Sequence, residues 1–347
     1  LALLSKSTYR GFMVALAGKA APTLGFELVR LEDGYYVPAV LEGGPAQRAG
    51  LRRGDRVLAI DDASPLLSSR LDWRSDDAYL PDPPTHALRC NEDEVVHLEI
   101  ERRPGEIMKI EILSAPYSSL DAARASSHVF DIDGYRVAYI HFWFVHAREM
   151  DRILLDALHT EFDDAHALIF DLRGRGGDGR MIRTVLDLLG GKRSPWNRPV
   201  IGLMDERTRS AKELLAHGLR KRGLGVLVGR TTAGAVLQAS FKRVGPESVL
   251  MYPAFGLGRA TDLLEGHGVS PDISVASSLP YAAGDDPILR VGLAVAHDLA
   301  RVTRPRDRPR LTGTQHGNFA RTGGEKPLSE RTGARNEASP VTRTLRW

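Results

Sequence analysis

Hydrophobic and polar positions alternate through residues 25–113 in a way that predicts a small β-rich domain. The alternation has the two-residue period of strands, and Asp33-Gly34, Gly54-Asp55 and Pro104-Gly105 mark turns. Pro45 to Ala49 reads as a short helix closed by Gly50. Residues 63–90 are polar and contain Pro81, Pro83 and Pro84, so we expect an inserted loop there. The predicted strands cover residues 25–29, 35–41, 56–61, 95–101 and 108–113.

The pattern changes after a Ser- and Ala-rich linker at residues 114–127. Nearly continuous apolar runs, typical of strands buried on both faces, alternate with amphipathic segments of helical period. This order predicts a mostly parallel sheet with helices packed on it. The predicted strands are 136–145, 168–172, 199–204 and 225–229, and the predicted helices are 150–158, 181–189 and 210–222.

Composition fits a globular protein of two domains and a tail. The 347 residues are 42% hydrophobic and 26% charged. We expect a lead segment at 1–21, the β-rich domain at 22–115, the α/β domain at 116–302 and a disordered basic tail at 303–347.

The charge distribution argues against a nucleic-acid partner. From Arg301 onward there are 11 Lys and Arg against 4 Asp and Glu, which leaves 36 against 40 in the preceding residues. The basic character belongs to the tail, whereas a nucleic-acid-binding domain carries its own basic face.

The sequence gives little indication of membrane insertion, a disulfide, a metal site or a cofactor. No run approaches about 18 apolar residues, and Phe12–Ala17 is too short for the core of a signal peptide. Cys90 is the only cysteine, so an internal disulfide is excluded. His141 lies on a predicted strand and His146 just after it; a spacing of five on a strand would place them on opposite faces, and no metal motif is present. We expect no metal and no cofactor.

Ser210 stands where a predicted strand meets a predicted helix. Ser210-Ala-Lys-Glu213 matches the capping-box pattern S-x-x-E. Free N–H groups and the positive end of the helix dipole gather at such a place, and both stabilise a developing oxyanion. Serine is also among the best N-cap residues. This segment alone leaves open whether Ser210 is a nucleophile or only a cap.

The glycine-rich turn Arg173-Gly-Arg-Gly-Gly-Asp-Gly179 follows the strand at 168–172 and is the second candidate site. Such a turn can form an anion-binding nest. It lacks the spacing of a phosphate-binding loop, so nucleotide binding is weakly indicated.

The run from Gly44 to Asp61, GPAQRAGLRRGDRVLAID, resembles a PDZ domain of the bacterial protease type. The resemblance implies that the loop formed by Leu24, Gly25, Phe26 and Glu27 holds the terminal carboxylate of a peptide. That peptide would add as a strand to the sheet edge. A packing module with a blocked groove is the alternative.

Four further segments, in order, resemble the core of the C-terminal processing peptidases, also called tail-specific proteases. Ser210–Glu213 resembles their nucleophile segment S-A-S-E. The others resemble the patterns L-I-x-D-L-R-x-N-x-G-G, V-V-G-x-x-T-x-G and G-x-G-V-x-P-D; they are Leu168–Gly177, Val226–Gly234 and Glu265–Asp272.

The resemblance implies a fold and an activity. The fold would be an α/β core of the crotonase and Clp-protease kind behind a PDZ domain. The activity would be hydrolysis of peptide bonds in polypeptides with free C-termini, with Ser210 as nucleophile. The N–H of Ala211 and one from Gly176 or Gly177 would form the oxyanion hole. The resemblance favours a bacterial envelope or secreted protein; a cytoplasmic location and a homo-oligomer stay open.

The sequence departs from this family at the general base. The family places a lysine directly after the glycine of T-x-G, where this chain has Ala235. The related tricorn-type core also lacks that lysine and uses a histidine-based relay. Lys212 and His217 on the same helix, and His141 and His146 on or after a strand, leave the base unassigned. A pseudopeptidase that binds protein tails through its PDZ domain is therefore the alternative.

Overall fold

The elements of the first half form a seven-stranded sheet around a small apolar core. In the computed structural model, which describes residues 2–73, 85–146, 149–174, 176–256 and 258–303, the strand order of this sheet is β6-β7-β3-β4-β5-β8-β9. Alternate residues such as Leu98 and Ile100 point into the core. The elements are β3 (Phe26–Leu31), β4 (Gly34–Val40), α2 (Pro45–Arg48), β5 (Arg56–Ile60), η1 (Pro65–Leu67), β6 (Leu71–Trp73), β7 (Thr85–Leu88), β8 (Val95–Arg103) and β9 (Glu106–Leu113).

The second half is built on a six-stranded sheet of order β11-β12-β13-β14-β15-β18. β11 pairs antiparallel with β12, and the other neighbours are parallel. The strands are β11 (His128–Ile132), β12 (Tyr135–His141), β13 (Ala167–Asp171), β14 (Val200–Met204), β15 (Gly225–Gly229) and β18 (Ile273–Ser274). The α/β core behind a β-rich PDZ-like domain is thereby confirmed.

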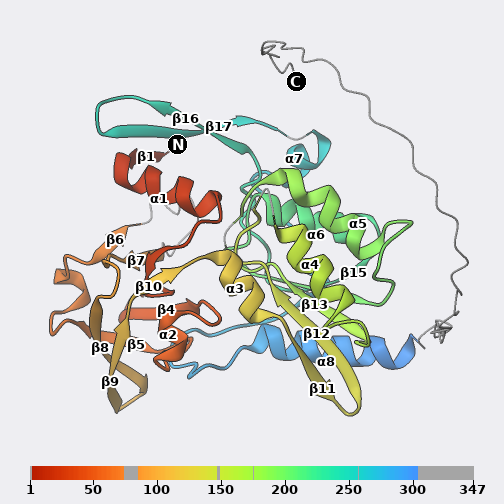
Figure 1. Cartoon of the computed structure of the whole chain (residues 1–347), viewed down its shortest axis with the longest axis horizontal. Helices are drawn as coiled ribbons and strands as arrows, with labels where there is room; N and C mark the ends of the chain where they lie inside the picture. The colour runs from red at the N-terminus through yellow and green to blue at the C-terminus, as the bar shows by residue number, and fades with distance from the viewer. Residues whose placement is uncertain (1, 74–84, 147–148, 175, 257, 304–347) are drawn as a thin grey trace, which may run out of the picture. The chain divides into compact units, whose positions relative to one another are not determined.

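Helices cover both faces of this sheet (Figure 1). Leu168 and Phe170 of β13 pack toward the helices α4 (Met150–His159), α5 (Ile182–Gly190) and α6 (Ala211–Lys221). Ile169, which points the other way, packs toward α8 (Pro287–Val302). This opposite placement of neighbouring apolar residues explains the continuous apolar strands in the sequence.

The remaining elements form two smaller sheets and several short helices. β1 (Ala2–Ser5), β17 (Ser248–Phe255) and β16 (Gln238–Arg243) form a third sheet, against which α1 (Lys6–Leu16) packs through Tyr9 and Phe12 on Phe241. The others are β2 (Ala21–Thr23), β10 (Ala115–Tyr117), α3 (Ser119–Ser126), η3 (Gly179–Met181) and α7 (Arg259–Leu264).

Three local predictions were wrong. The stretch 63–90, expected to be a loop, contains η1, β6 and β7. The expected linker contains β10 and α3, because Ser118 and Asp121 form a capping box that starts a helix. The strand expected at 136–145 ends at His141, and Val145 instead bridges to Gly177. The tail expected to be disordered lies, apart from Thr303, outside the described residues.

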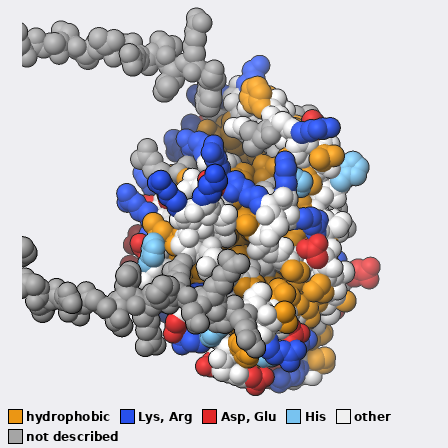
Figure 2. All heavy atoms as spheres, turned by 90° about the vertical axis from the view of Figure 1, so that its right-hand side faces the viewer, with side chains coloured by type: hydrophobic (Ala, Val, Ile, Leu, Met, Phe, Trp, Pro, Cys, Tyr) orange, Lys and Arg blue, Asp and Glu red, His pale blue; other side chains and the backbone are white. Residues whose placement is uncertain are grey.

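The surface is mixed in character. On the face drawn in Figure 2, Lys and Arg side chains are scattered among hydrophobic and neutral ones, with Asp and Glu between them. No helix within the described ranges is long and apolar enough to cross a membrane.

Candidate active site

Ser210 lies in the turn between β14 and α6, with a backbone conformation that an ordinary helix cap does not have. An N-cap residue normally has extended dihedral angles. Ser210 has φ 54° and ψ −125°, in a region costly for any residue with a Cβ. Its side chain is half-buried. A strained serine on a sharp turn from strand to helix is the arrangement of a nucleophile elbow.

The carboxylate of Glu213 holds this turn against the loop that follows β15. Its oxygens accept hydrogen bonds from the N–H of Ser210 (2.9 Å), the hydroxyl of Thr232 (2.6 Å) and the N–H groups of Gly234 and Ala235 (2.7 and 2.9 Å). Burial raises the pKa of the Glu213 carboxyl, and these donors oppose that rise. The carbonyl of Ala235 also accepts from the N–H of Ser210 at 3.0 Å. Ala235 stands where the family has its lysine, and its backbone is therefore in direct contact with Ser210.

The glycine turn lies against Ser210 on its other side. A Cβ on Gly176 would stand 2.6 Å from the Cβ of Ser210 and 2.8 Å from the carbonyl oxygen of Arg209. Gly177, with φ 143°, leaves no room for a Cβ beside the backbone of Val145. Two hydrogen bonds close this bridge, from the N–H of Val145 to the Gly176 carbonyl (3.0 Å) and from the N–H of Asp178 to the Val145 carbonyl (2.7 Å). Glycine is required here for close approach of the backbones.

Three N–H groups around Ser210 are available to a ligand. Among the residues that the structure describes, those of Ala211, Gly176 and Gly177 have no hydrogen-bond acceptor. Ala211 is the first residue of α6, so its N–H belongs to the positive end of the helix dipole. The resemblance implies these three residues for the oxyanion hole, and the fold brings Gly176 against Ser210.

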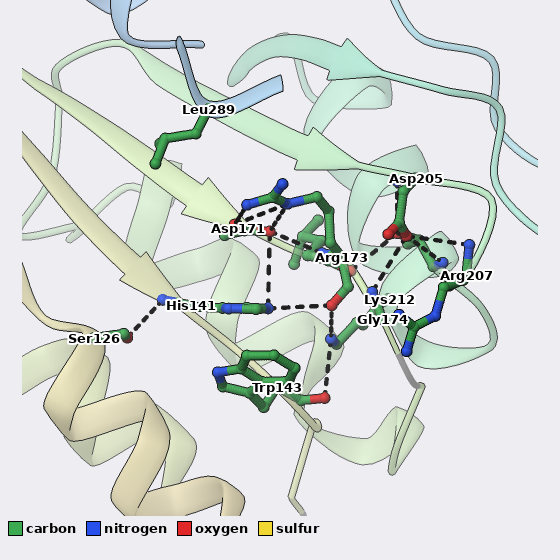
Figure 3. Close-up of polar contacts among 12 residues, drawn as sticks. Ser126, His141, Trp143, Asp171, Arg173, Gly174, Asp205, Arg207, Lys212 and Leu289 are labelled. Atoms are coloured by element: carbon green, nitrogen blue, oxygen red, sulfur yellow. Dashed lines mark hydrogen bonds and ion pairs between the residues drawn. The ribbon is translucent and has the colours of Figure 1, made fainter. Parts of the chain in front are cut away.

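Charged side chains surround the start of the glycine turn (Figure 3). Arg173 makes bonds of 2.7 and 2.8 Å to Asp286 and contacts Asp171. Burial by itself would raise the pKa of Asp171, but the charges of Arg173 and His141 hold it well below its usual range. Asp205 accepts from the N–H of Gly174 (3.3 Å) and of Thr208 (2.9 Å), which connects the glycine turn to the loop before Ser210.

None of the candidate general bases hydrogen-bonds to Ser210. His141 contacts the carboxylate of Glu42 at 3.1 Å and the carbonyl of Arg173 at 3.2 Å. His146 is buried, contacts Ser119 Oγ at 2.7 Å, and has its pKa lowered by burial. Burial likewise lowers the pKa of His217, and no contact joins this residue to Ser210.

Lys212, the fourth candidate, is fully buried and turns away from the serine. Its Nζ donates to the carbonyls of Arg173 (2.7 Å) and Trp143 (3.1 Å). The base is therefore unassigned within the described part of the chain.

The loop predicted to bind a carboxylate lies at the start of β3. Leu24 is buried, and its carbonyl accepts from the N–H of Ala46 at 2.9 Å. The N–H of Gly25 donates to Thr23 Oγ1 at 3.1 Å. Glu27 forms an ion pair with Arg207 of the α/β half, close in sequence to Ser210. Peptide binding at this loop remains a prediction.

The chain's own strand β7 pairs with the edge of β3. Leu28 lies opposite His86, and Val29 opposite Thr85. An added peptide strand would meet β7 after about two residues.

A cavity of about 630 Å³ lies between the PDZ-like half and the carboxyl ends of the core strands. Its lining includes Glu42, Arg53, His141, Arg173 and Arg207, but not Ser210. It therefore borders the loop 205–207 that leads to Ser210 and is not a cleft at the serine itself. No group of three His, Cys, Asp or Glu in the described ranges is arranged to hold a metal ion.

Comparison with known proteins shows what this chain is similar to. Residues 184–275 match the model of peptidase family S41, and residues 36–74 match a PDZ domain model. The chain is thus similar to the S41 peptidases in one segment and to a PDZ domain in another. A putative S41 protease from Bacteroides fragilis shares the fold, with 16% identity, a TM-score of 0.54, and coverage of 84% of this chain and 86% of that one. The photosystem II D1 C-terminal processing protease aligns at 17% identity and TM-score 0.47, over 82% of each chain.

One curated protein similar to this chain has a tricorn name. Over 168 residues it is 27% identical to the "Putative tricorn protease homolog 2" of Streptomyces coelicolor, covering 41% of this chain and 14% of the relative. The chain thus spans about a seventh of the length of that relative.

Sequence reasoning missed several residues that build the site. Glu213 was assigned only to a capping box, whereas its carboxylate also binds the loop 232–235. Glu42, which contacts His141 and Trp143, gave no signal, because its partners are about 100 positions away.

Proposed function

We propose that the chain is a serine-type peptidase in which Ser210 attacks the carbonyl of a peptide bond. The observation that carries the proposal is the strained backbone of Ser210, at φ 54° and ψ −125°. Strain of this kind costs about 1–3 kcal/mol and persists only where surrounding contacts impose it. Here Glu213, the Ala235 carbonyl and Gly176 impose it together.

The expected chemistry follows from the groups around the serine. The Ser210 hydroxyl forms a bond to the carbonyl carbon, and the oxygen of the tetrahedral intermediate carries the negative charge. The N–H groups of Ala211 and of Gly176 or Gly177 bind that oxygen, and the N-terminus of α6 adds its dipole. The serine's proton passes to a base that is not assigned here.

The substrate proposed is a polypeptide with a free C-terminus, recognised at Leu24–Glu27. The ion pair between Glu27 and Arg207 supports recognition at this loop, because it connects the start of β3 to the loop that leads to Ser210. With β7 on the same edge, the first two positions of β3 receive the tail.

A fluorophosphonate probe, which reacts with activated serines, tests the peptidase. We expect labelling of the full chain and none of Ser210→Ala. Ser240→Ala, on β16, is the matched control and should keep its label. Folded wild-type protein that takes no label, with or without tail peptide, would contradict the proposal.

A second candidate function is a pseudopeptidase that binds protein tails without cleaving them. It is favoured by Ala235, whose backbone contacts Ser210 where the family has lysine, and by the absence of a His or Lys contact to Ser210 in the described ranges.

Ala235→Lys distinguishes the two functions, with Ala235→Met as a control of similar length. If the chain lacks a base, the lysine should raise probe labelling at least tenfold and the methionine should not. If a base already acts, both variants should lower the labelling rate by crowding the serine.

A further inference from the structure

Lys212 is an unusual residue for the first turn of α6. It is fully buried, and none of the described Asp or Glu side chains forms an ion pair with it. Burying an ammonium ion costs several kcal/mol unless partners compensate it. Within the described ranges, its hydrogen-bond partners are two backbone carbonyls, those of Trp143 and Arg173.

Figure 3 shows Lys212 reaching both carbonyls, which belong to two separate segments of the chain. Trp143 precedes Val145, and Arg173 precedes the glycine turn. Val145 and the glycine turn are joined by the backbone hydrogen bonds at Gly176 and Asp178. Lys212 lies two residues after Ser210, in the first turn of α6. It therefore connects both segments of that bridge to the helix that begins next to the serine.

None of the other charged groups described around Lys212 holds both carbonyls. His141 also reaches the carbonyl of Arg173, but from the PDZ-facing side, where Glu42 contacts its other nitrogen. Asp171 and Asp205 favour the ammonium form, whereas Arg173 and Arg207 disfavour it. Lys212 also disfavours the charged form of His146.

We propose that Lys212 is a positioning residue, which fixes the glycine turn at the correct distance from Ser210 by holding the carbonyls of Trp143 and Arg173. This inference rests on the proposed function for its catalytic consequence. Its structural part, a turn held in place by one buried side chain, can be measured without any activity.

Amide hydrogen exchange provides that measurement. The N–H groups of Val145 and Asp178 report on the bridge, and that of Leu215, in α6, is an internal reference. In Lys212→Met we expect exchange at Val145 and Asp178 to quicken at least tenfold and Leu215 to be unchanged. Lys221→Met, an exposed change at the end of the same helix, is the matched control and should alter none of the three.

Probe labelling provides the second readout. The labelling rate of Lys212→Met should fall at least thirtyfold, while Lys212→Arg, which keeps two donors and the charge, should recover part of it. If Lys212→Met fails to fold, Lys212→Gln replaces it. That side chain is one bond shorter, reaches at most one carbonyl, and should show an intermediate increase in exchange.

The outcomes separate the two proposals. Unchanged exchange at Val145 and Asp178 in a folded variant overturns the role of Lys212, whether or not Ser210 is labelled. Quickened exchange in a chain whose wild type takes no label supports the positioning role and rejects the peptidase.

Discussion

Gly176 and Ser210 are so close that a single methyl group on the glycine would stand 2.6 Å from the Cβ of the serine. Real Cβ atoms do not approach so closely, and the carbonyl of Arg209 blocks the same space at 2.8 Å. The glycine turn and the strained serine are therefore built as one unit. A substitution in the glycine turn should therefore shift Ser210, and a substitution at Ser210 should shift the turn.

Gly176→Ala should damage the site. The new Cβ must displace the turn or Ser210, so we expect probe labelling to fall at least a hundredfold, with destabilisation of about 1–3 kcal/mol from overpacking. Gly174→Ala, in the same turn but with open space at its Cβ, should cost only the strain of its positive φ. Equal effects of the two changes would mean that contact with Ser210 is unimportant.

Ser210→Gly should stabilise the chain. Glycine adopts positive φ without penalty, so we expect the free energy of unfolding to rise by about 1 kcal/mol in urea denaturation. Ser118, the N-cap of α3, has the extended dihedral angles of an ordinary cap. Ser118→Gly should therefore lower the free energy of unfolding by a few tenths of a kcal/mol. If Ser210→Gly instead lowers the free energy of unfolding by the same amount as Ser118→Gly, Ser210 is an ordinary helix cap.

Lys212 should make stability depend on pH. Burial lowers the pKa of its ammonium group to about 7, although Asp171 and Asp205 oppose the shift. The unfolded chain keeps a lysine pKa near 10.4, so between these values the unfolded state binds more protons and stability rises with pH.

A difference measurement isolates that effect. Relative to Lys212→Met, wild type should gain on the order of 2 kcal/mol in unfolding free energy between pH 7 and 9, since one proton is worth at most about 1.4 kcal/mol per pH unit. Urea denaturation at several pH values measures it. A difference between the two proteins that does not change with pH contradicts the shifted pKa.

β7 should limit the binding of peptide tails. Because it pairs with β3 at Leu28 and Val29, replacing residues 71–88 by a short Gly-Ser linker should expose the rest of the edge. We expect affinity for a peptide with an apolar last residue and a free carboxylate to rise at least tenfold. Fluorescence anisotropy measures this, and the C-terminally amidated peptide is the control. Unchanged affinity in a folded variant would show that tails do not bind at this edge.

The sequence alone determined the order and type of most elements that carry the site. The apolar runs of β13, β14 and β15 and the amphipathic period of α6 are local patterns, and the glycines of the turn are local as well. These features placed Ser210 at a helix start and the glycine turn after a strand. Parallel strands then bring their carboxyl ends to one edge, which is why these two loops meet.

Only the tertiary structure decided how the loops meet. The positive φ of Ser210, the four donors gathered on Glu213 and the two carbonyls held by Lys212 all depend on partners in separate segments. Likewise, β7 became a strand because the edge of β3 offers unpaired backbone groups, although its own segment is polar and rich in proline. Local propensity cannot encode such contacts, because their free energy comes from close packing and hydrogen bonds between residues far apart in the chain.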